Sequence, residues 1–400
     1  MIRKIFSRTF TQQEAISQEA IDAASEVLKT GRLHRYNTIE DELSQVSLLE
    51  QEYASYQGSR YCLACTSCGY ALSISLKAAG LESGDYVLTN SYTLAPVPGA
   101  ISNAGGRAIF VEINENLVLD LDDLAQKATS SGARFLLLSH MRGHIVDMNE
   151  LMRIVQEKNL ILIEDCAHTM GAKWGKKKSG NFGLAACFST QTYKHLNSGE
   201  GGLITSDNAE FMARAIVLSG SYMFYERHGA APEAEVFSDI RLQTPNYSGR
   251  MDNLRAAILR PQLISLEENI KRWNKRYQIV EQKLQKVTGV VLPERPDEER
   301  YVGSSFQFRI PGISHTKAGK FIEANKQLGV EIKWFGSDEP TGFTSNHKSW
   351  KYLEYQDLEN SDKILSGLFD LRLPLTFSLD DCSLLSDIIS ECVQEYQSTK

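Results

Sequence analysis

Short apolar runs alternate with amphipathic segments through the first half of the chain. Apolar runs of strand length stand at residues 61–67, 87–90, 108–113, 135–139, 160–163, 187–190 and 202–205. Helical spacing of apolar positions marks residues 70–79, 95–104, 121–128 and 148–157. Such alternation predicts an α/β fold with a mainly parallel sheet, right-handed crossovers and helices on both faces. Ligands of these sheets bind at the carboxyl ends of the strands, where Ser67, His140 and Asp165 fall.

The pattern changes in the last third of the chain. Residues 252–287 carry apolar positions at helical spacing, and Pro261 is expected to kink this helix or to end one segment of it. We expect a large domain of residues 1–255, which includes an N-terminal segment of residues 1–40, and a smaller C-terminal α/β domain of residues 256–400 with the long helix. Within the second domain the pattern predicts strands at 306–310 and 330–334 and helices at 316–328 and 379–397.

Composition narrows the class of partner and the compartment. The 400 residues are 42% apolar, which suffices for two cores. A net charge of -7 without a clustered basic patch argues against nucleic acid as a partner. No apolar stretch of about 18 or more residues predicts a membrane span, and the N-terminus does not read as a signal peptide. With seven cysteines, an odd number for a disulfide framework, we expect a cytoplasmic protein with reduced thiols.

The first candidate for chemistry is Lys194. It lies five residues after Ser189 and five before Gly199 in the run FSTQTYKHLNSGEGG. A lysine amine forms an imine with an aldehyde, and a nearby hydroxyl and glycine-freed N–H groups hold a phosphate. This arrangement predicts a covalently bound pyridoxal 5'-phosphate (PLP).

Two upstream segments supply what such a cofactor needs. A buried strand at 160–165 would deliver Asp165 to pair with the pyridine nitrogen of the cofactor; the alternative is that Asp165 caps the next helix. The strand at 61–67 is followed by Cys68 and Gly69, which open a helix. The first N–H groups of that helix lack internal partners and can bind a dianionic phosphate.

Two patterns suggest metal sites instead. The C-x2-C-x2-C run at 62–68 has ligand-like spacing, but it lies on an apolar strand and no fourth ligand follows at the right distance. His140 and His144 are four residues apart, but Gly143 interrupts them. Buried small thiols and a loop beside the substrate or cofactor are the preferred interpretations.

These elements together resemble the DegT/DnrJ/EryC1/StrS family of PLP-dependent sugar aminotransferases, which have the fold-type I architecture with a seven-stranded-type sheet. The most specific motifs are EDCAHTMGA at 164–172 and YKHLNSGEGG at 193–202. The resemblance runs from about Gly31 to about Leu263 and becomes vague in the last third of the chain.

The resemblance implies roles for individual residues. Lys194 would be the Schiff-base lysine, Asp165 the partner of the pyridine nitrogen, and His168 the neighbour of the phenolic oxygen. His168 could instead be a core histidine and Ser189 an ordinary strand residue. The phosphate ligands that the resemblance implies are Ser189, Ser67 and the backbone of Cys68 and Gly69.

Several positions depart from the family pattern. The phosphate loop lacks its usual threonine, so Ser67 or Thr66 would substitute for it. The aromatic residue that normally stacks on the ring is replaced by Leu94, and Tyr92 could supply a ring face instead. The asparagine that reaches the neighbouring subunit's phosphate would be Asn246, or Ser248 in its place. The family typically forms homodimers with shared active sites, and we expect the same here.

The expected reaction is a two-stage amino transfer. An amino acid, expected to be L-glutamate, would give its amino group to the cofactor to form pyridoxamine 5'-phosphate (PMP), which would pass it to a keto-deoxysugar, most often nucleotide-linked. Alternatives are a PMP-dependent sugar dehydratase, where histidine typically replaces the lysine, and a keto acceptor that is not nucleotide-linked, such as a cyclitol. An alternative of another class is a regulatory protein that has kept the fold and lost turnover.

Overall fold

The computed structural model describes residues 5–398, and its centre is a seven-stranded sheet in the order β1-β9-β8-β5-β4-β2-β3. Strands β3, β2, β4, β5 and β8 are parallel, whereas β9 runs antiparallel to both β8 and β1. The mainly parallel sheet predicted from the alternating pattern is therefore confirmed. The strands are β1 Tyr61–Cys65, β2 Tyr86–Asn90, β3 Arg107–Val111, β4 Phe135–Ser139, β5 Ile161–Asp165, β8 Ala185–Ser189 and β9 Gly202–Ser206.

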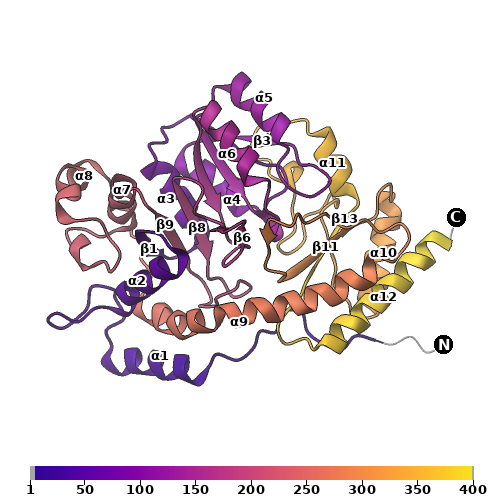
Figure 1. The fold of residues 1–400 in the computed structure, drawn as a ribbon, viewed down its shortest axis with the longest axis horizontal. Helices are drawn as coiled ribbons and strands as arrows, with labels where there is room; N and C mark the ends of the chain where they lie inside the picture. Colours follow the sequence, from indigo (N-terminus) through magenta and orange to yellow (C-terminus); the bar gives the residue numbers. More distant parts are fainter. Residues whose placement is uncertain (1–4, 399–400) are drawn as a thin grey trace.

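Helices cover both faces of this sheet (Figure 1). Alternate residues of a strand point to opposite faces, so Leu136 and Leu138 of β4 join one core while Phe135 and Leu137 join the other. The first core is closed by α2 (Gln45–Gln57), α5 (Leu121–Ser131) and α6 (Met148–Glu157), and the second by α3 (Cys68–Ala78), α4 (Pro96–Ala104) and α7 (Ala209–Ser219). The start of α3 therefore lies against the sheet.

The long helix α9 (Asn253–Leu284) connects the two domains and runs along one side of the molecule in Figure 1. The Asp252 side chain caps it by accepting a hydrogen bond from the Arg255 N–H. Pro261 does not end it, contrary to one of the two outcomes expected from the sequence. Proline removes one helix hydrogen bond, but buried residues on either side, among them Leu259 and Leu266, hold both flanks in the core.

The C-terminal domain has a three-stranded antiparallel sheet in the order β11-β13-β12, formed by Ser305–Arg309, Leu368–Arg372 and Lys333–Trp334. The strand expected at 330–334 is thus shorter, and β13 is a strand that the sequence analysis did not predict. Helices α10 (His315–Gln327) and α12 (Leu379–Ser398) pack against one another beside it. The remaining elements are α8 Phe237–Gln243, α11 Glu359–Ser366, the short strands β6 Lys173–Trp174, β7 Lys177–Lys178 and β10 Glu299–Arg300, and 3-10 turns at Met141–Gly143, Tyr225–Arg227, Ala234–Val236 and His347–Ser349.

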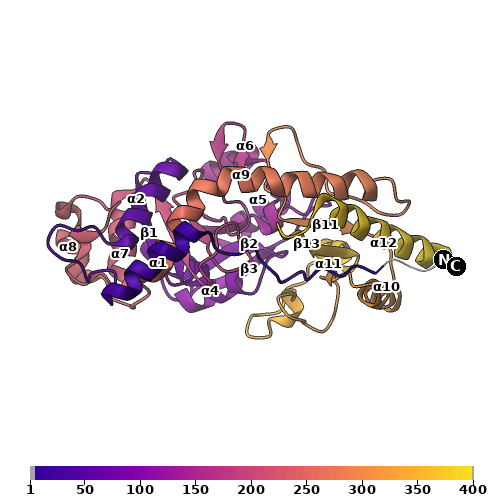
Figure 2. The same cartoon turned by 90° about the horizontal axis from the view of Figure 1, so that it is seen from below.

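The beginning of the described chain packs with the second domain. Phe6 and Phe10 are buried in the C-terminal core, and both rings make edge contacts with Phe377. Figure 2 shows this segment running beside α12 before the chain reaches α1 (Gln18–Thr30), which lies along α9. The segment of residues 1–40 was expected with the large domain, and within its described part Phe6 and Phe10 have their apolar partners in the C-terminal core.

The segment that follows β12 returns to the large domain. Phe335 packs against Tyr92 at a ring-centroid distance of 5.0 Å, and Trp350 packs against Phe110 of β3 at 5.7 Å. These contacts fix the C-terminal domain against the carboxyl ends of the central strands. Among residues 5–398, no helix is both long and apolar enough to cross a membrane.

Candidate active site

A cavity of about 330 Å³ opens where the carboxyl ends of the central strands meet the C-terminal domain. Its size is typical of small-molecule sites. The structure brings together here most of the residues singled out from the sequence, from segments more than a hundred residues apart. Those that line the cavity are Ser67, Cys68, Gly69, Asp165, His168, Ser189 and Lys194.

Lys194 lies in the loop between β8 and β9 with its amine inside the cavity. Its Nζ is 2.7 Å from Nε2 of His168. Burial and the nearby Arg142 guanidinium lower the pKa of Lys194 to about 8. Burial, together with the charge of Lys194, holds the pKa of His168 well below its usual range, so the imidazole is neutral and its Nε2 accepts the hydrogen bond. The lysine is thus prepared to act as a neutral nucleophile near physiological pH.

Asp165 ends β5 and is held by three groups. Its Oδ2 accepts a hydrogen bond from Ser139 Oγ at 3.1 Å, and its Oδ1 accepts one from the Ala167 N–H at 3.1 Å. The Cys68 Sγ lies 4.0 Å from Oδ1. The next regular element after Asp165 is the short strand β6, and the next helix, α7, begins only at Ala209, so Asp165 does not cap a helix. Burial raises the pKa of this carboxyl above its ordinary value, which a cationic ring nitrogen would offset.

Ser139 is a site residue that the sequence analysis did not single out. Its Oγ accepts a hydrogen bond from Thr93 Oγ1 at 2.9 Å, which leaves its own proton to donate to Asp165. The Asn90 side chain fixes the Ser139 backbone by bonding both its N–H and its C=O. The signal that could have found it is its register: Ser139 pairs with Asp165 across β4 and β5, at the ends of neighbouring parallel strands.

The start of α3 is shaped to hold an anion. Ser67 is the N-cap, and its Oγ accepts a hydrogen bond from the Tyr70 N–H at 3.1 Å. The N–H groups of Cys68 and Gly69 lie in the first turn, where the helix has no acceptor for them and its dipole is positive. Gly202 lets β9 approach this loop, because a Cβ there would fall 2.5 Å from the Ser67 carbonyl. Ser189 lines the same cavity from the end of β8.

Two of the residues singled out from the sequence are not at this chain's cavity. Tyr92 is 1% exposed, and its ring packs on Phe335 beneath the site, whereas Leu94 lines the cavity. The Tyr92 ring is held there because it fills the apolar contact between the two domains. Asn246 lies exposed in the loop before α9, where its Oδ1 accepts a hydrogen bond from the Ser248 N–H at 3.3 Å.

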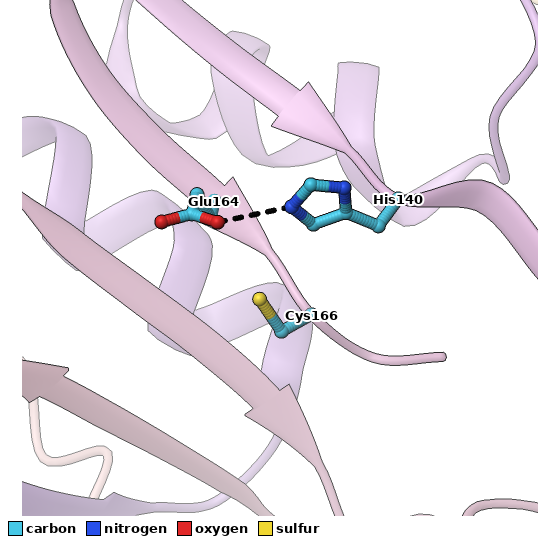
Figure 3. A group of neighbouring side chains, drawn as sticks. All are labelled: His140, Glu164 and Cys166. Atoms are coloured by element: carbon cyan, nitrogen blue, oxygen red, sulfur yellow. Dashed lines mark hydrogen bonds and ion pairs between the residues drawn. The ribbon is translucent and has the colours of Figure 1, made fainter. Parts of the chain in front are cut away.

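The described residues contain one group of possible metal ligands, formed by His140, Glu164 and Cys166 (Figure 3). Their ligand atoms lie within 4.8 Å of one another. The carboxylate of Glu164 is already saturated, because it accepts hydrogen bonds from the His140 ring and from the backbone N–H groups of Gly180, Phe182 and Gly183. This arrangement fixes the loop after β7 rather than offering an open metal site.

The other histidines near the site have structural partners. His144 bonds Gln307 at 2.8 Å, which places it on the contact with the C-terminal domain. His195, next to Lys194, bonds Ser304 Oγ at 3.0 Å and packs edge-on against Trp273. It does not line the cavity, so the lysine and not the histidine faces the reacting space.

The fold and the cavity define the class of protein. A mainly parallel seven-stranded sheet with a lysine amine in the cavity, a carboxylate at a neighbouring strand end and a helix N-terminus for a phosphate is the arrangement of the fold-type I PLP-dependent transferases. The chain belongs to the DegT/DnrJ/EryC1/StrS aminotransferase family, whose sequence model matches residues 14–388. It is a PLP-dependent aminotransferase.

Curated relatives cover most of the chain at moderate identity. The spore coat polysaccharide biosynthesis protein SpsC of Bacillus subtilis is 27% identical over 331 residues, which are 79% of this chain and 80% of the relative. The dTDP-3-amino-3,4,6-trideoxy-alpha-D-glucose transaminase of Micromonospora megalomicea is 28% identical over 79% of this chain and 80% of the relative.

A solved structure shares the fold. The E. coli GDP-4-keto-6-deoxy-D-mannose-3-dehydratase with bound hydrated PLP superposes with a TM-score of 0.81 at 20% identity, covering 97% of this chain and 100% of that chain. At this identity the likeness shows the fold alone.

Proposed function

We propose that the protein transfers an amino group from L-glutamate to a nucleotide-linked keto-deoxysugar. This acceptor is supported by a relative that is named as the transaminase of a dTDP-linked amino sugar. PMP is the form in which the cofactor carries the amine between the two half-reactions. The observation that carries the proposal is the Lys194 amine, which lines the cavity, has a lowered pKa and is hydrogen-bonded to His168. The name of the polysaccharide relative supports a role in the synthesis of amino sugars.

The residues of the cavity fit PLP. When bound, PLP supplies an aldehyde that reacts with amines and a ring that withdraws electrons from the substrate carbon. Asp165 would hold the ring nitrogen in its protonated form, and the first turn of α3 with Ser189 would hold the phosphate. Lys194 would bind the aldehyde carbon and, once displaced by the substrate amine, would hold and return the proton at its Nζ.

Transfer is favoured over dehydration by the positions of two neighbouring residues. A PMP-dependent dehydratase typically has histidine in place of the lysine, and this chain has Lys194 in the cavity while His195 is held by Ser304 and Trp273. The acceptor is either a nucleotide-linked keto sugar or a keto acceptor without a nucleotide, such as a cyclitol. Testing each compound in the second half-reaction distinguishes them.

We also propose a homodimer with shared active sites. Asn246 is exposed and lies away from its own chain's cavity, which suits a residue that completes the phosphate site of a second subunit. Replacing Asn246 with Ala should weaken PLP binding without changing the state of association. Equilibrium dialysis of PLP together with sedimentation would measure both, and unchanged PLP affinity would contradict this role.

The absorbance spectrum of the PLP-loaded protein tests the proposed function. L-glutamate should convert the absorbance band of the lysine-bound cofactor to the PMP band, and a keto-deoxysugar nucleotide should restore the first band. A spectrum untouched by L-glutamate and other amino acids would contradict transfer. Release of water from the sugar without net amino transfer would establish the dehydratase instead.

A further inference from the structure

A second cleft lies between the two domains, separated from the active-site cavity by the 3-10 turn after β4. Its volume is about 960 Å³, and it is lined by the loops after β3 and β4, by β6, by the end of α9 and by the segment that leads to β10. Arg142 of the turn lines the active-site cavity, whereas the next residues, His144 and Ile145, line this cleft. We call it the interdomain cleft, and none of the roles described above uses it.

The interdomain cleft is strongly acidic. Eight carboxylates line it, and Arg295 is the only lysine or arginine among the described residues that do so. Four of the carboxylates have partners in the protein as helix caps or in ion pairs: Asp120, Asp147, Glu150 and Glu299. The other four have no cationic nitrogen within 4.0 Å among the described residues: Asp122, Glu281, Glu294 and Glu298. A ligand that enters the cleft is therefore favoured by positive charge.

Glu281 of α9 is a partly buried member of this unpaired group. Burial raises the pKa of its carboxyl above the ordinary value, and the charge of Arg295 offsets only part of this effect. A carboxylate that is withdrawn from water without a cation beside it is costly. A cationic ligand in the cleft would remove that cost.

Two buried donors that line the same cleft lack acceptors. Trp174 of β6 is 6% exposed, and its Nε1 has no hydrogen-bond partner among the described residues. The Arg295 side chain is 7% exposed. Its Nη1 donates to the Gly143 carbonyl at 3.1 Å and to Glu299 at 2.7 Å, whereas its Nη2 has no acceptor within residues 5–398. Buried donors are nearly always partnered in proteins, so this pair favours a ligand that brings oxygen lone pairs.

The carboxylates and the two donors together select one ligand chemistry. A metal ion or a polyamine would bind the carboxylates but offers no lone pair to an N–H group. A phosphate or a carboxylate would accept from the N–H groups but would be repelled by the acidic lining. A hydroxyl group donates to a carboxylate and accepts from an N–H group, and an amine adds the positive charge.

We propose that the interdomain cleft is a second ligand site, for a hydroxylated amine of the amino sugar class. Glu281 and the other unpaired carboxylates would bind the ammonium group, while Trp174 and Arg295 would donate to hydroxyl oxygens. The cleft and the active-site cavity share no lining residue among those described. The inference therefore goes beyond the proposed function and does not depend on it.

The test is titration calorimetry of the PLP-loaded protein with N-methyl-D-glucamine, a hydroxylated chain whose secondary amine forms no neutral imine with PLP. D-glucitol, which has a hydroxyl group in place of that amine, is the uncharged match. Glu281→Gln should weaken binding of the amine by about ten-fold, and Trp174→Phe, which removes a neutral donor, by about three-fold. Glu268→Gln is the matched control, because Glu268 lies on the same helix but pairs with Lys271 outside the cleft.

The expected result is that N-methyl-D-glucamine binds more tightly than D-glucitol, less tightly to both cleft variants, and unchanged to Glu268→Gln. The two variants alter different elements, so the test does not rest on the folding of one of them. Equal binding to all the proteins, or no binding to the unaltered protein, overturns the site. Equal affinity for D-glucitol overturns the role of the carboxylates. Mg²⁺ that displaces the amine and is insensitive to Trp174→Phe overturns the amino sugar in favour of a metal ion. None of these readouts involves amino transfer, so a failure of transfer with L-glutamate would be seen separately.

Discussion

The two walls of the cavity differ in how completely their polar groups are partnered. On the large-domain wall, Asp165 is held by Ser139 and the Ala167 N–H, and Lys194 is bonded to His168. On the opposite wall, Arg142 and Lys333 share one carboxylate, Asp370, and among the described residues the Arg142 Nε has no acceptor. Polar groups that are already hydrogen-bonded within the protein suit a cofactor that stays bound. Charged groups that lack partners suit a ligand that binds and leaves in each reaction cycle.

The largest loss of activity is expected from a substitution on the large-domain wall, whose polar groups are partnered. Lys194→Ala removes the amine that we propose binds PLP and moves the proton, so single-turnover amino transfer from L-glutamate should fall by about 10³-fold or more. Lys194→Arg should behave alike, because a guanidinium does not form the imine. His195→Ala, which alters the neighbour that faces away, is the comparison variant. Comparable loss in His195→Ala with a native melting temperature would break the assignment.

Asp165→Asn should have the next largest effect. The amide keeps the size of the side chain but does not hold a ring nitrogen in its protonated form, so the rate of amino transfer should fall by about 10²-fold or more while PLP remains bound. Stopped-flow absorbance gives the rate, and dialysis gives PLP retention. A variant with the unaltered rate would show that the carboxylate is structural.

Ser139→Ala tests how the hydrogen-bond partners of Asp165 on the large-domain wall set the pKa of this carboxyl. It removes the Ser139 hydrogen bond that lowers the pKa of Asp165, so the pKa of Asp165 should rise further. The acid limb of the transfer rate should therefore move to higher pH, with a loss of about ten-fold near neutrality. Thr93→Val, one bond further from Asp165, should shift the limb less. Equal pH profiles for the unaltered protein, Ser139→Ala and Thr93→Val would contradict this effect of the Thr93–Ser139–Asp165 hydrogen bonds.

The smallest effect concerns the pH dependence of PLP uptake by the protein without cofactor. Only the neutral lysine amine attacks an aldehyde, and the pKa of Lys194 is lowered to about 8. The rate of PLP uptake should therefore rise with pH and reach half its maximum at about pH 8. A midpoint near the ordinary lysine pKa of about 10.4 would contradict the buried, partly neutral amine.

The parts of the site that could be predicted from the sequence are those built by local segments. The β5 strand end places Asp165, the loop after β8 places Lys194, and the first turn of α3 places Cys68 and Gly69, each within a short run of residues. Strand length and helical spacing also located most of the central sheet. These features depend on backbone geometry that neighbouring residues set.

The parts that could not be predicted depend on the contact between domains. Arg142, Lys333 and Arg372 are charged residues of ordinary appearance in the sequence, and only the docking of β12 and β13 against the turn after β4 gathers them. The same contact turns Tyr92 toward Phe335 and away from the cavity. Phe6 likewise reaches its core from the far end of the chain.

The most direct test of the central claim is a single-turnover assay of the PLP-loaded protein with L-glutamate. After denaturation, 2-oxoglutarate and PMP are quantified for each chain with bound PLP. The account predicts that the two products form in equal amounts, approaching one per loaded chain, and that Lys194→Ala forms neither. PLP recovered unchanged after incubation with L-glutamate, in a protein that retains its native spectrum, would contradict it.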